Sequence, residues 1–520
     1  MKVGAGAMSM IDGLTGALLN LLEARTLALI VVAILFSLLI GILPGLGGSV
    51  VIALLIPVSY GMSPETAVTF LIAAYSVVGF GGMITSILVN TPGDPENAAT
   101  MADGFPMARQ GRAAEAIGAG TCASVIGGLI GAGLLIALLP LARQILLRLS
   151  YPEFFMMAIL GLTIISVVTQ GRTYRGLVAA GVGFMLAFIG LDPVTGSPRF
   201  TFDALYLWDG VDLVAAIIGL FAGAEVIALY GEKTPIMDSR DGRAAATSTF
   251  WMGIKAGLRH WTLLVRGGIL GTGIGIVPGV GGVVASFVSY GQAVQTSKTP
   301  ERFGKGAVEG VIAAESANDA KQGGALLPTV AFGIPGSTGM AVLLGALTLH
   351  GVPAGPTMIR DHMDIVYALI VSMVVAKLFA TLIVWAIGSR AVWFTKIRGE
   401  LVAPVIVVIA LTGAYALERE ILDVLTVLIF AYVGYEMKKR EFSRVALIIA
   451  MVLGGLVERS YHQTLSAFGG VSGFVTRPIA AVLLALTVIS LLTPPLLALR
   501  RRRSAPDAAS ENRPVPRDGG

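Results

Sequence analysis

Two short Pro-Gly segments interrupt long apolar runs, and the second segment repeats the first. Residues 41–48 read GILPGLGG and residues 275–282 read GIVPGVGG, so six of the eight positions are identical. Two further pairs of similar segments follow in the same order: 91–94 with 334–337, and 104–106 with 351–353. Self-similarity that keeps its order over such a length indicates an internal duplication.

The positions of these segments constrain the fold strongly. Proline removes an amide donor and breaks a helix, and glycine allows the backbone to turn and other groups to approach it closely. In a bilayer, broken backbone is tolerated only where protein buries it or where it lines a watery cavity. Matching Gly/Pro interruptions in two halves of a chain indicate the binding site of a secondary transporter. The alternative is that these glycines only allow helices to pack closely.

Composition indicates a membrane protein. The chain has 520 residues and a mean hydropathy of +0.82, and only 13% of its residues are charged, whereas about 25% is usual for soluble proteins. Apolar runs of about 20 residues recur along the chain, as transmembrane helices require. We therefore expect an all-α polytopic membrane protein with about eleven to thirteen spans in two homologous halves, which carry broken or re-entrant helices.

Charged loops set the expected organisation and topology. Short basic loops mark the cytoplasmic side, and they account for the small net charge of +5, which does not indicate a nucleic-acid partner. The protein should lie in the lipid bilayer of a bacterial inner membrane with its C-terminus in the cytoplasm. We expect five segments: a first transmembrane repeat over 1–230, a basic cytoplasmic linker over 231–261, a second repeat over 262–400, C-terminal transmembrane helices over 401–500, and a disordered tail over 501–520.

The helix breaks suggest how an anion could bind. A half-helix that begins inside the membrane presents free amides and the positive end of its dipole, which favour a carboxylate. The half-helix that enters the break presents carbonyls, which suit Na⁺ or a proton-carrying water. The candidate substrate-binding residues are Gly45, Gly47, Gly48, Asn90, Thr91, Pro92, Gly93, Gly279, Gly281, Gly282, Pro335, Gly336, Ser337 and Thr338. Arg109, Arg112 and Lys321 are nearby cations, and each is more typical of a loop or topology charge than of a ligand.

Two polar stretches each allow two interpretations. Residues 90–112 form either a solvated connection or a substrate-facing tip, and the match to the second half favours the tip. An otherwise small and apolar stretch carries Glu309, Glu315, Asn318, Asp319 and Lys321. Ionisable residues within a span are usually functional or paired. The alternative is an interfacial helix whose charges face water.

Three long motifs carry a resemblance to a known family: GILPGLGG, NTPGDPENAATMADGFPMARQG and ESANDAKQGGALLPTVAFGIPGSTGMAVLLGALTLHGVPAGP. In their order they are similar to the large membrane subunit of the tripartite tricarboxylate transporter family, over roughly residues 20–430. The resemblance implies a small membrane partner of four spans and a periplasmic solute-binding protein. It also implies transport of citrate or a related carboxylate, driven by an ion gradient. An elevator-like movement is expected by analogy with other ion-coupled carboxylate carriers.

The chain departs from the family pattern at acidic positions. Asp94 precedes Pro95 and Glu96 where small residues are common, and Asp319 lies where an Asn-Asn pair is usual. Acids beside an anion site indicate either a role in cation coupling or a substrate other than citrate. The candidates for coupling are Asp94, Asn97, Asn318 and Asp319, with Na⁺ or H⁺ as the ion; no other metal or cofactor is expected.

Other functional classes are less consistent with the sequence. The chain contains no GxxxxGK[ST] segment for ATP, and none of the HExxH or GxSxG motifs that a membrane-embedded enzyme could use. A scaffold or receptor would have no use for duplicated breaks. A passive anion channel stays open as an alternative, and dependence of uptake on an ion gradient would separate it from a carrier.

Overall fold

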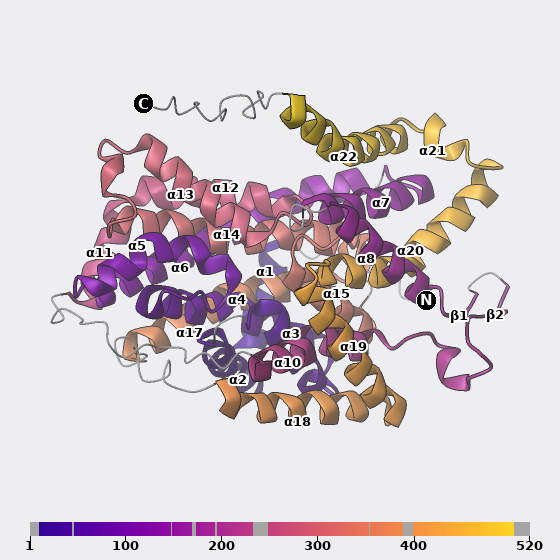
Figure 1. Ribbon diagram of the computed structural model, residues 1–520, viewed down its shortest axis with the longest axis horizontal. Helices are drawn as coiled ribbons and strands as arrows, with labels where there is room; N and C mark the ends of the chain where they lie inside the picture. The colour runs from indigo at the N-terminus through magenta and orange to yellow at the C-terminus, as the bar shows by residue number, and fades with distance from the viewer. Residues whose placement is uncertain are drawn as a thin grey trace, which may run out of the picture.

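The protein is almost entirely helical (Figure 1). The computed structural model describes residues 10–43, 46–146, 148–168, 173–192, 195–231, 248–352, 354–387 and 399–503. Among these residues, five helices are long and apolar enough to cross a membrane, and shorter apolar helices accompany them. The expected all-α polytopic membrane fold is confirmed, while the number of spans and the segment boundaries stay predictions.

The first part of the chain contains both short and long helices around the first break. Its elements are α1 (Met10–Leu21), α2 (Ala24–Gly41), α3 (Gly48–Ser59), α4 (Pro64–Val89), the 3-10 turn η1 (Pro95–Asn97), α5 (Ala98–Arg109), α6 (Ala113–Leu146), α7 (Tyr151–Val168) and α8 (Thr173–Ala187). A hairpin then leads to a helix with a π-helical middle: β1 (Gly190–Leu191), β2 (Pro198–Arg199), η3 (Leu205–Leu207), α9 (Leu213–Ile217), η4 (Ile218–Gly223) and α10 (Ala224–Gly231).

The second part repeats the order of elements around its own break. Its elements are α11 (Phe250–Arg259), α12 (Trp261–Ile276), α13 (Gly281–Thr296), η5 (Pro300–Arg302), α14 (Val308–Phe332), α15 (Thr338–Leu349), α16 (Pro356–Asp361) and α17 (Met363–Ile387). In each part, one helix ends before a Pro-Gly segment, the next begins at its Gly-Gly pair, and a long helix follows. Thus α2, α3 and α4 correspond in order to α12, α13 and α14.

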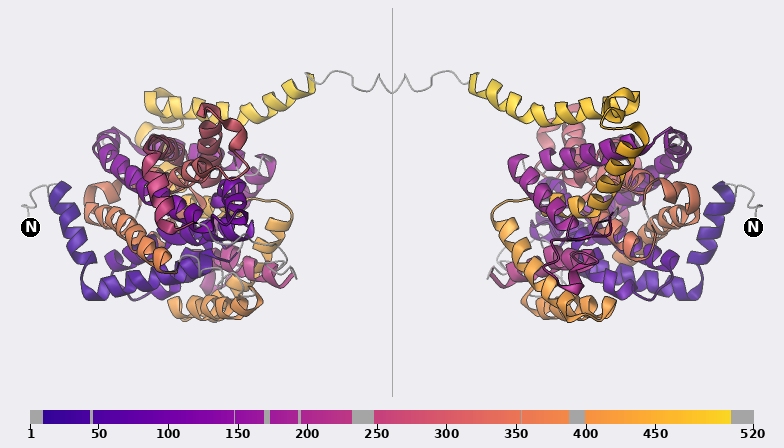
Figure 2. Two further views of the ribbon diagram at one scale, coloured as in Figure 1. Left: turned by 90° about the vertical axis from the view of Figure 1, so that its left-hand side faces the viewer. Right: turned by 90° about the vertical axis from the view of Figure 1, so that its right-hand side faces the viewer.

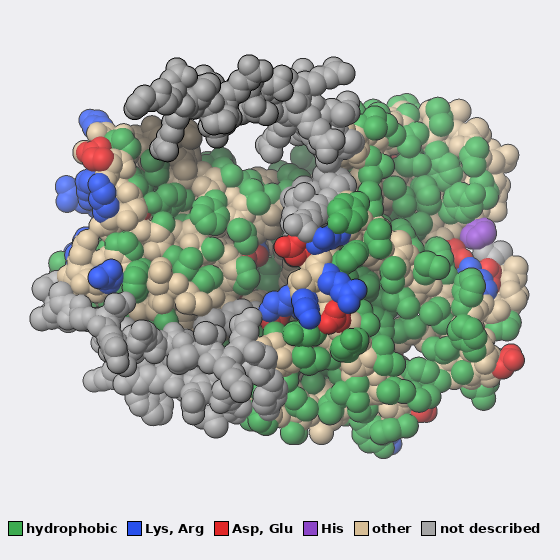
Figure 3. Space-filling view, viewed as in Figure 1, with side chains coloured by type: hydrophobic (Ala, Val, Ile, Leu, Met, Phe, Trp, Pro, Cys, Tyr) green, Lys and Arg blue, Asp and Glu red, His purple; other side chains and the backbone are tan. Residues whose placement is uncertain are grey.

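The remaining helices lie at the C-terminal end of the chain. They are α18 (Gly399–Glu418), α19 (Ile421–Lys439), α20 (Arg444–Phe468), α21 (Gly473–Thr476) and α22 (Pro478–Arg503). Figure 2 shows α22 (yellow) and α18 (orange) along opposite faces of the helical body. Both helices expose large apolar side chains, among them Val405, Val408, Val482 and Ile489. Such surfaces suit contact with lipid, and hydrophobic side chains cover much of the face in Figure 3.

Helix α14 is the buried centre of the fold. All residues over 310–331 are buried, and the helix packs against α5, α6, α12 and α13. Small residues make this packing close: a methyl group added at Gly131 of α6 would lie 2.4 Å from the Ala320 carbonyl oxygen. Close backbone approach of this kind is typical of helices in membranes. The interpretation of this stretch as an interfacial helix with its charges in water is therefore wrong.

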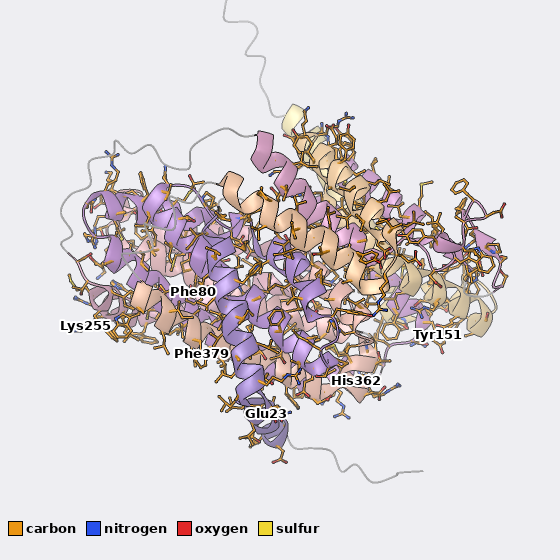
Figure 4. All side chains as sticks on the ribbon, turned by 90° about the horizontal axis from the view of Figure 1, so that it is seen from below. Glu23, Phe80, Tyr151, Lys255, His362 and Phe379 are labelled. Carbon is orange, nitrogen blue, oxygen red and sulfur yellow. The ribbon has the colours of Figure 1, made fainter. Side chains whose placement is uncertain are left out.

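A second core lies beside α14. Phe80 of α4 and Phe379 of α17 pack into one hydrophobic cluster in the interior (Figure 4), whereas Glu23 and Lys255 lie at the edges of the molecule. Lys377, on the same helix as Phe379, places its ammonium over the Phe80 ring. The core between α4 and α17 therefore holds a charge as well as apolar side chains.

Short sequence patterns agree with the observed helices at some positions and differ from them at others. The sequence Ser63-Pro64-Glu65 is typical of a helix start, and the structure agrees, because Ser63 caps α4 and its hydroxyl accepts from the Thr66 amide. The similar Thr299-Pro300-Glu301 begins only the single turn η5, and α14 starts at Val308. Residues 90–112, expected as an irregular loop or tip, largely form α5, because small residues there pack against the buried α4 and α14.

Candidate functional site

One cavity of about 550 Å³ lies where the two Pro-Gly segments approach each other. Its wall comes from both halves of the chain and from the C-terminal helices. The lining includes 47–50, Tyr75, 94–96, Phe221, Glu225, 279–284, 337–339, Lys438, 442–445 and Ile449. Segments more than 200 residues apart in the sequence therefore form a single site.

The first wall is the N-terminus of α3. Gly47 precedes this helix and offers no side chain as a cap. The carboxylate of Asp94 replaces the cap: its Oδ2 accepts a hydrogen bond from the Gly48 amide at 3.0 Å. Asp94 Oδ1 accepts from the Glu96 amide, also at 3.0 Å, which begins η1. A carboxylate at a helix N-terminus is favoured by the free amides and by the helix dipole.

The second wall is the N-terminus of α13, and Glu96 meets it. Glu96 Oε1 accepts from the Gly282 amide at 3.4 Å, and the Ser286 hydroxyl donates to the Glu96 carbonyl at 3.0 Å. The approach leaves no room for a side chain, since a methyl group added at Gly282 would lie 2.6 Å from the Glu96 carboxyl carbon. Two acids that are two residues apart thus cover the helix N-termini of both breaks.

A chain of polar contacts continues from Glu96 to α15. The buried Lys321 ammonium donates to Glu96 Oε1 and, at 3.3 Å, to the Tyr75 hydroxyl. The Tyr75 hydroxyl lies 3.1 Å from Ser337 Oγ, and Ser337 caps α15 by accepting from the Met340 amide. Tyr75 fits there because position 339 is glycine: an added methyl group would lie 2.0 Å from the tyrosine ring. The N-terminus of α15 therefore faces the cavity with a hydroxyl cap.

Behind the tips lies a cluster around the buried Glu315. Asn97 Nδ2 donates to its carboxylate at 3.0 and 3.1 Å, the Thr100 hydroxyl donates to it, and Ser124 lies at 3.4 Å. The side-chain oxygens of Asn97 and Asn318 are buried and have no hydrogen-bond partner within the described residues. Buried polar atoms are nearly always paired, so these two oxygens are candidates for contact with a bound ion or water.

Asp319 points to a different partner. Its Oδ1 accepts from the ammonium of Lys377, which also donates to the Ser76 carbonyl and to Gln322 Oε1, each at 2.9 Å. Lys377 and Asp319 are both buried. A buried charge is tolerated only when it is paired and hydrogen-bonded, as Lys377 is here. Asp319 therefore has an ionic partner outside the cavity lining, while its Oδ2, like the oxygens of Asn97 and Asn318, is buried without a partner among the described residues.

The outer part of the cavity carries a group of three charges. Glu225 accepts from the Lys438 ammonium at 2.6 Å and from the Arg444 guanidinium at 2.9 Å. Arg444 also donates to the Leu220 carbonyl and stacks over Phe221. Lys438 is 43% exposed, while Glu225 is nearly buried. The outer part therefore has two cations for one carboxylate.

The structure separates the residues predicted from sequence into two groups. The cavity is lined by Gly47, Gly48, Asp94, Gly279, Gly281, Gly282, Ser337 and Thr338. Outside its lining lie Asn90, Thr91, Pro92, Gly93, Asn97, Asn318, Asp319, Pro335 and Gly336. Asn90 ends α4 in a left-handed conformation, and Gly93 packs onto the Gly41 carbonyl. Gly45 lies outside the described residues.

Several cavity residues were missed by sequence reasoning. Glu225 comes from α10 at the end of the first repeat, whereas Lys438 and Arg444 come from helices beyond the second repeat, and their convergence depends on the tertiary fold. Lys321 was interpreted as a topology charge, but its side chain is fully buried against Glu96. The rule that an ionisable residue in a span needs a partner could have identified both Lys321 and Lys377.

Comparisons with known proteins agree with this architecture. The model of the "Tripartite tricarboxylate transporter TctA family" matches residues 27–449. An "Uncharacterized 52.8 kDa protein in TAR-I ttuC' 3'region" of Agrobacterium vitis is 32% identical over 473 residues, which cover 91% of this chain and 93% of that protein. An "Uncharacterized protein in TAR-II ttuC' 3'region" of the same organism is 32% identical over 234 residues, 45% of this chain and 97% of that protein. No solved structure matches the chain.

Proposed function

Because the chain belongs to the tripartite tricarboxylate transporter TctA family, of which it is a large membrane subunit, we propose that it imports a carboxylate by secondary transport driven by a cation gradient. The observation that carries the proposal is the shared cavity, in which both Pro-Gly breaks and the N-terminus of α15 meet. Helix N-termini at broken segments are the means by which many transporters bind the anionic groups of their substrates. A site made by two repeats can change its access as one repeat moves against the other, so we include elevator-like alternating access in the proposal.

The coupling ion is proposed to bind beside the tips, where the oxygens of Asn97 and Asn318 are buried without a described partner. A methyl group added at Gly282 would lie 2.9 Å from Asn318 Oδ1, so this oxygen adjoins the second tip. Asp94 supplies a carboxylate at the first tip, where it accepts from the Gly48 amide. Oxygen ligands of this kind suit Na⁺, and the carboxylate would equally serve a proton. Asp319 Oδ1 is engaged by Lys377, so we leave Asp319 out of the proposed ion site, although its Oδ2 is buried without a described partner.

We further propose an inner-membrane location and two partners, a small membrane subunit of four spans and a periplasmic solute-binding protein. The family is tripartite, which supports this assembly. The basic turn 438–440 favours a cytoplasmic position for the end of α19. Since Lys438 lines the cavity, this orientation implies a cavity that faces the cytoplasm.

Uptake of labelled carboxylates tests the proposal. Cells would express the chain with its small subunit and binding protein, and receive citrate, succinate, malate, glutamate or an aromatic carboxylate, with and without a Na⁺ gradient. The proposal expects gradient-dependent uptake of at least one of them. Uptake that follows only the concentration of the substrate would favour a passive channel. No uptake by the assembled complex would contradict the carboxylate assignment.

A further inference from the structure

We propose that the cavity takes a small carboxylate with at most one net negative charge and an ammonium or hydroxyl group at its other end, in preference to a di- or tricarboxylate. The inference rests on the proposed function and specifies its substrate class. It follows from the acids at the two tips and from the distribution of charge along the cavity.

The first argument concerns the helix N-termini. The amides of Gly48 and Gly282, which a substrate carboxylate would be expected to occupy, already donate to Asp94 and Glu96. Among the described helices whose first residues line the cavity, α15 and α20 differ, because the hydroxyls of Ser337 and Ser443 cap them in place of a carboxylate. The protein's own carboxylates therefore take the two helix ends at the Pro-Gly breaks, and the other two ends carry neutral hydroxyl caps.

The second argument concerns charge. Among the described residues that line the cavity or pair directly with its lining, three are carboxylates and three are cations: Asp94, Glu96 and Glu225, and Lys321, Lys438 and Arg444. No excess of positive charge is available for a citrate with three negative charges. A bound coupling cation would add one positive charge, which one net negative charge on the substrate would balance.

The third argument concerns where these charges lie. Asp94 and Glu96 lie at the inner end, where the buried Lys321 pairs with Glu96, so this end has one excess negative charge. Lys438 and Arg444 share Glu225 at the outer end, which has one excess positive charge. Asn318 Oδ1 adds a buried acceptor without a described partner beside the second tip. A ligand that complements both ends has a carboxylate for Lys438 and Arg444 and a donor for Asp94 and Glu96.

A second carboxylate on the substrate would face these acids. Like charges within several ångströms in a partly buried site repel strongly, so each extra carboxylate should weaken binding by about tenfold or more. The amino and hydroxyl versions share the chemistry of a hydrogen-bond donor, and they differ in whether the donor is charged.

The test is stabilisation of the purified full chain by ligands in detergent with Na⁺, since a ligand that binds the folded state raises its melting temperature. Two matched sets separate charge from size. The first is 4-aminobutyrate, 4-hydroxybutyrate and succinate; the second is 4-(aminomethyl)benzoate, 4-(hydroxymethyl)benzoate and terephthalate. Citrate completes the panel, and titration of each ligand gives its apparent affinity.

The inference expects the amino or hydroxyl member of a set to bind with an affinity about tenfold or more above that of the dicarboxylate in the same set. Citrate should bind no more tightly than the dicarboxylates. The tighter binder of the amino and hydroxyl members shows whether the hydrogen-bond donor of the substrate is an ammonium or a hydroxyl group. Asp94→Asn keeps an acceptor for the Gly48 amide and removes one inner charge. It should therefore raise the affinity for the dicarboxylate about tenfold relative to the hydroxyl member. Glu301→Gln, an exposed acid outside the cavity, is the control and should leave the ratio unchanged.

Two outcomes would overturn the inference alone. One is a wild-type chain that binds succinate, terephthalate or citrate as tightly as the amino and hydroxyl members of the sets, which leaves carboxylate transport intact. The other is that Asp94→Asn and Glu301→Gln show the same ratio of affinities for the dicarboxylate and the hydroxyl member of a set. If no member of either set stabilises the folded chain, and the assembled complex takes up no carboxylate, the proposed function fails as well.

Discussion

Glu96 and Lys321 join the two halves of the chain: the fully buried Lys321 ammonium donates to Glu96 Oε1, and the same oxygen accepts from the Gly282 amide. Glu96 comes from the segment after α4, and Lys321 comes from the middle of α14. A buried ion pair contributes little net stability, but the loss of one partner leaves an unpaired buried charge. The contact therefore makes the two halves depend on each other at the cavity wall.

Glu96→Gln should lower the free energy of unfolding by about 3 kcal/mol, because it leaves the Lys321 ammonium buried without its counter-charge. The double variant Glu96→Gln/Lys321→Met removes both charges and should recover about half of that loss. Denaturation of the purified chain measures both, with Glu436→Gln, from an exposed pair with Arg440, as the control. Additive losses in the double variant would show that the two groups are not coupled.

Gly282→Ala should abolish uptake while the protein still inserts into the membrane. The added methyl group would lie 2.6 Å from the Glu96 carboxyl carbon and 2.9 Å from Asn318 Oδ1, so it would displace the groups that form the second tip. Gly291→Ala on the same helix is the matched control, because nothing lies within 4 Å of its added methyl group. Uptake and membrane content would be measured together, and normal uptake by Gly282→Ala would refute the close approach at this tip. Gly45→Val, Gly279→Val and Pro335→Leu should likewise abolish uptake.

Asp94→Asn should change the ion dependence of uptake more than the amount of protein in the membrane. The side chain keeps its hydrogen bond with the Gly48 amide, so the fold of the tip is preserved while the charge is lost. The measurement is the activation of uptake by Na⁺ and by protons, relative to the wild-type curve. An activation curve identical to the wild type would exclude Asp94 from coupling.

Lys377→Met should destabilise the protein by about 3–5 kcal/mol without changing its ion dependence, because it leaves Asp319 buried and unpaired. Asp319→Asn keeps an oxygen near Lys377 and should cost less. Thermal stability and the Na⁺ activation of residual uptake would be recorded for both variants. A shifted activation curve in Asp319→Asn, with stability unchanged, would return Asp319 to the coupling site.

The sequence allowed much of the architecture to be predicted because its patterns are local. Pro and Gly at each break act on the backbone at their own positions, and Ser63-Pro64-Glu65 marks a helix start through short-range hydrogen bonds. The start of α4 at Pro64 agrees with this pattern. Thr299-Pro300-Glu301 shows the limit of this reasoning, since the same residue types there begin a single turn.

The candidate site was harder to predict because it depends on tertiary pairing. Asp94 and Glu96 were recognised as unusual acids, but the sequence does not reveal that each covers a different helix N-terminus. Asp319 is a predicted coupling residue, but local spacing does not reveal that Lys377, 58 residues away in the sequence, pairs with it. Arg444 reaches the cavity from a helix beyond the second break, a contact that no local spacing indicates.

Uptake into proteoliposomes tests the central claim most directly. The chain, reconstituted with its small subunit, would receive a labelled carboxylate on its binding protein, under an inward Na⁺ gradient, an inward proton gradient or no gradient. Cation-coupled import predicts accumulation above the outside concentration under one of the two gradients, and loss of that accumulation when the gradient is dissipated. Equilibration to the outside concentration under all three conditions would contradict the account, because it would describe a passive channel.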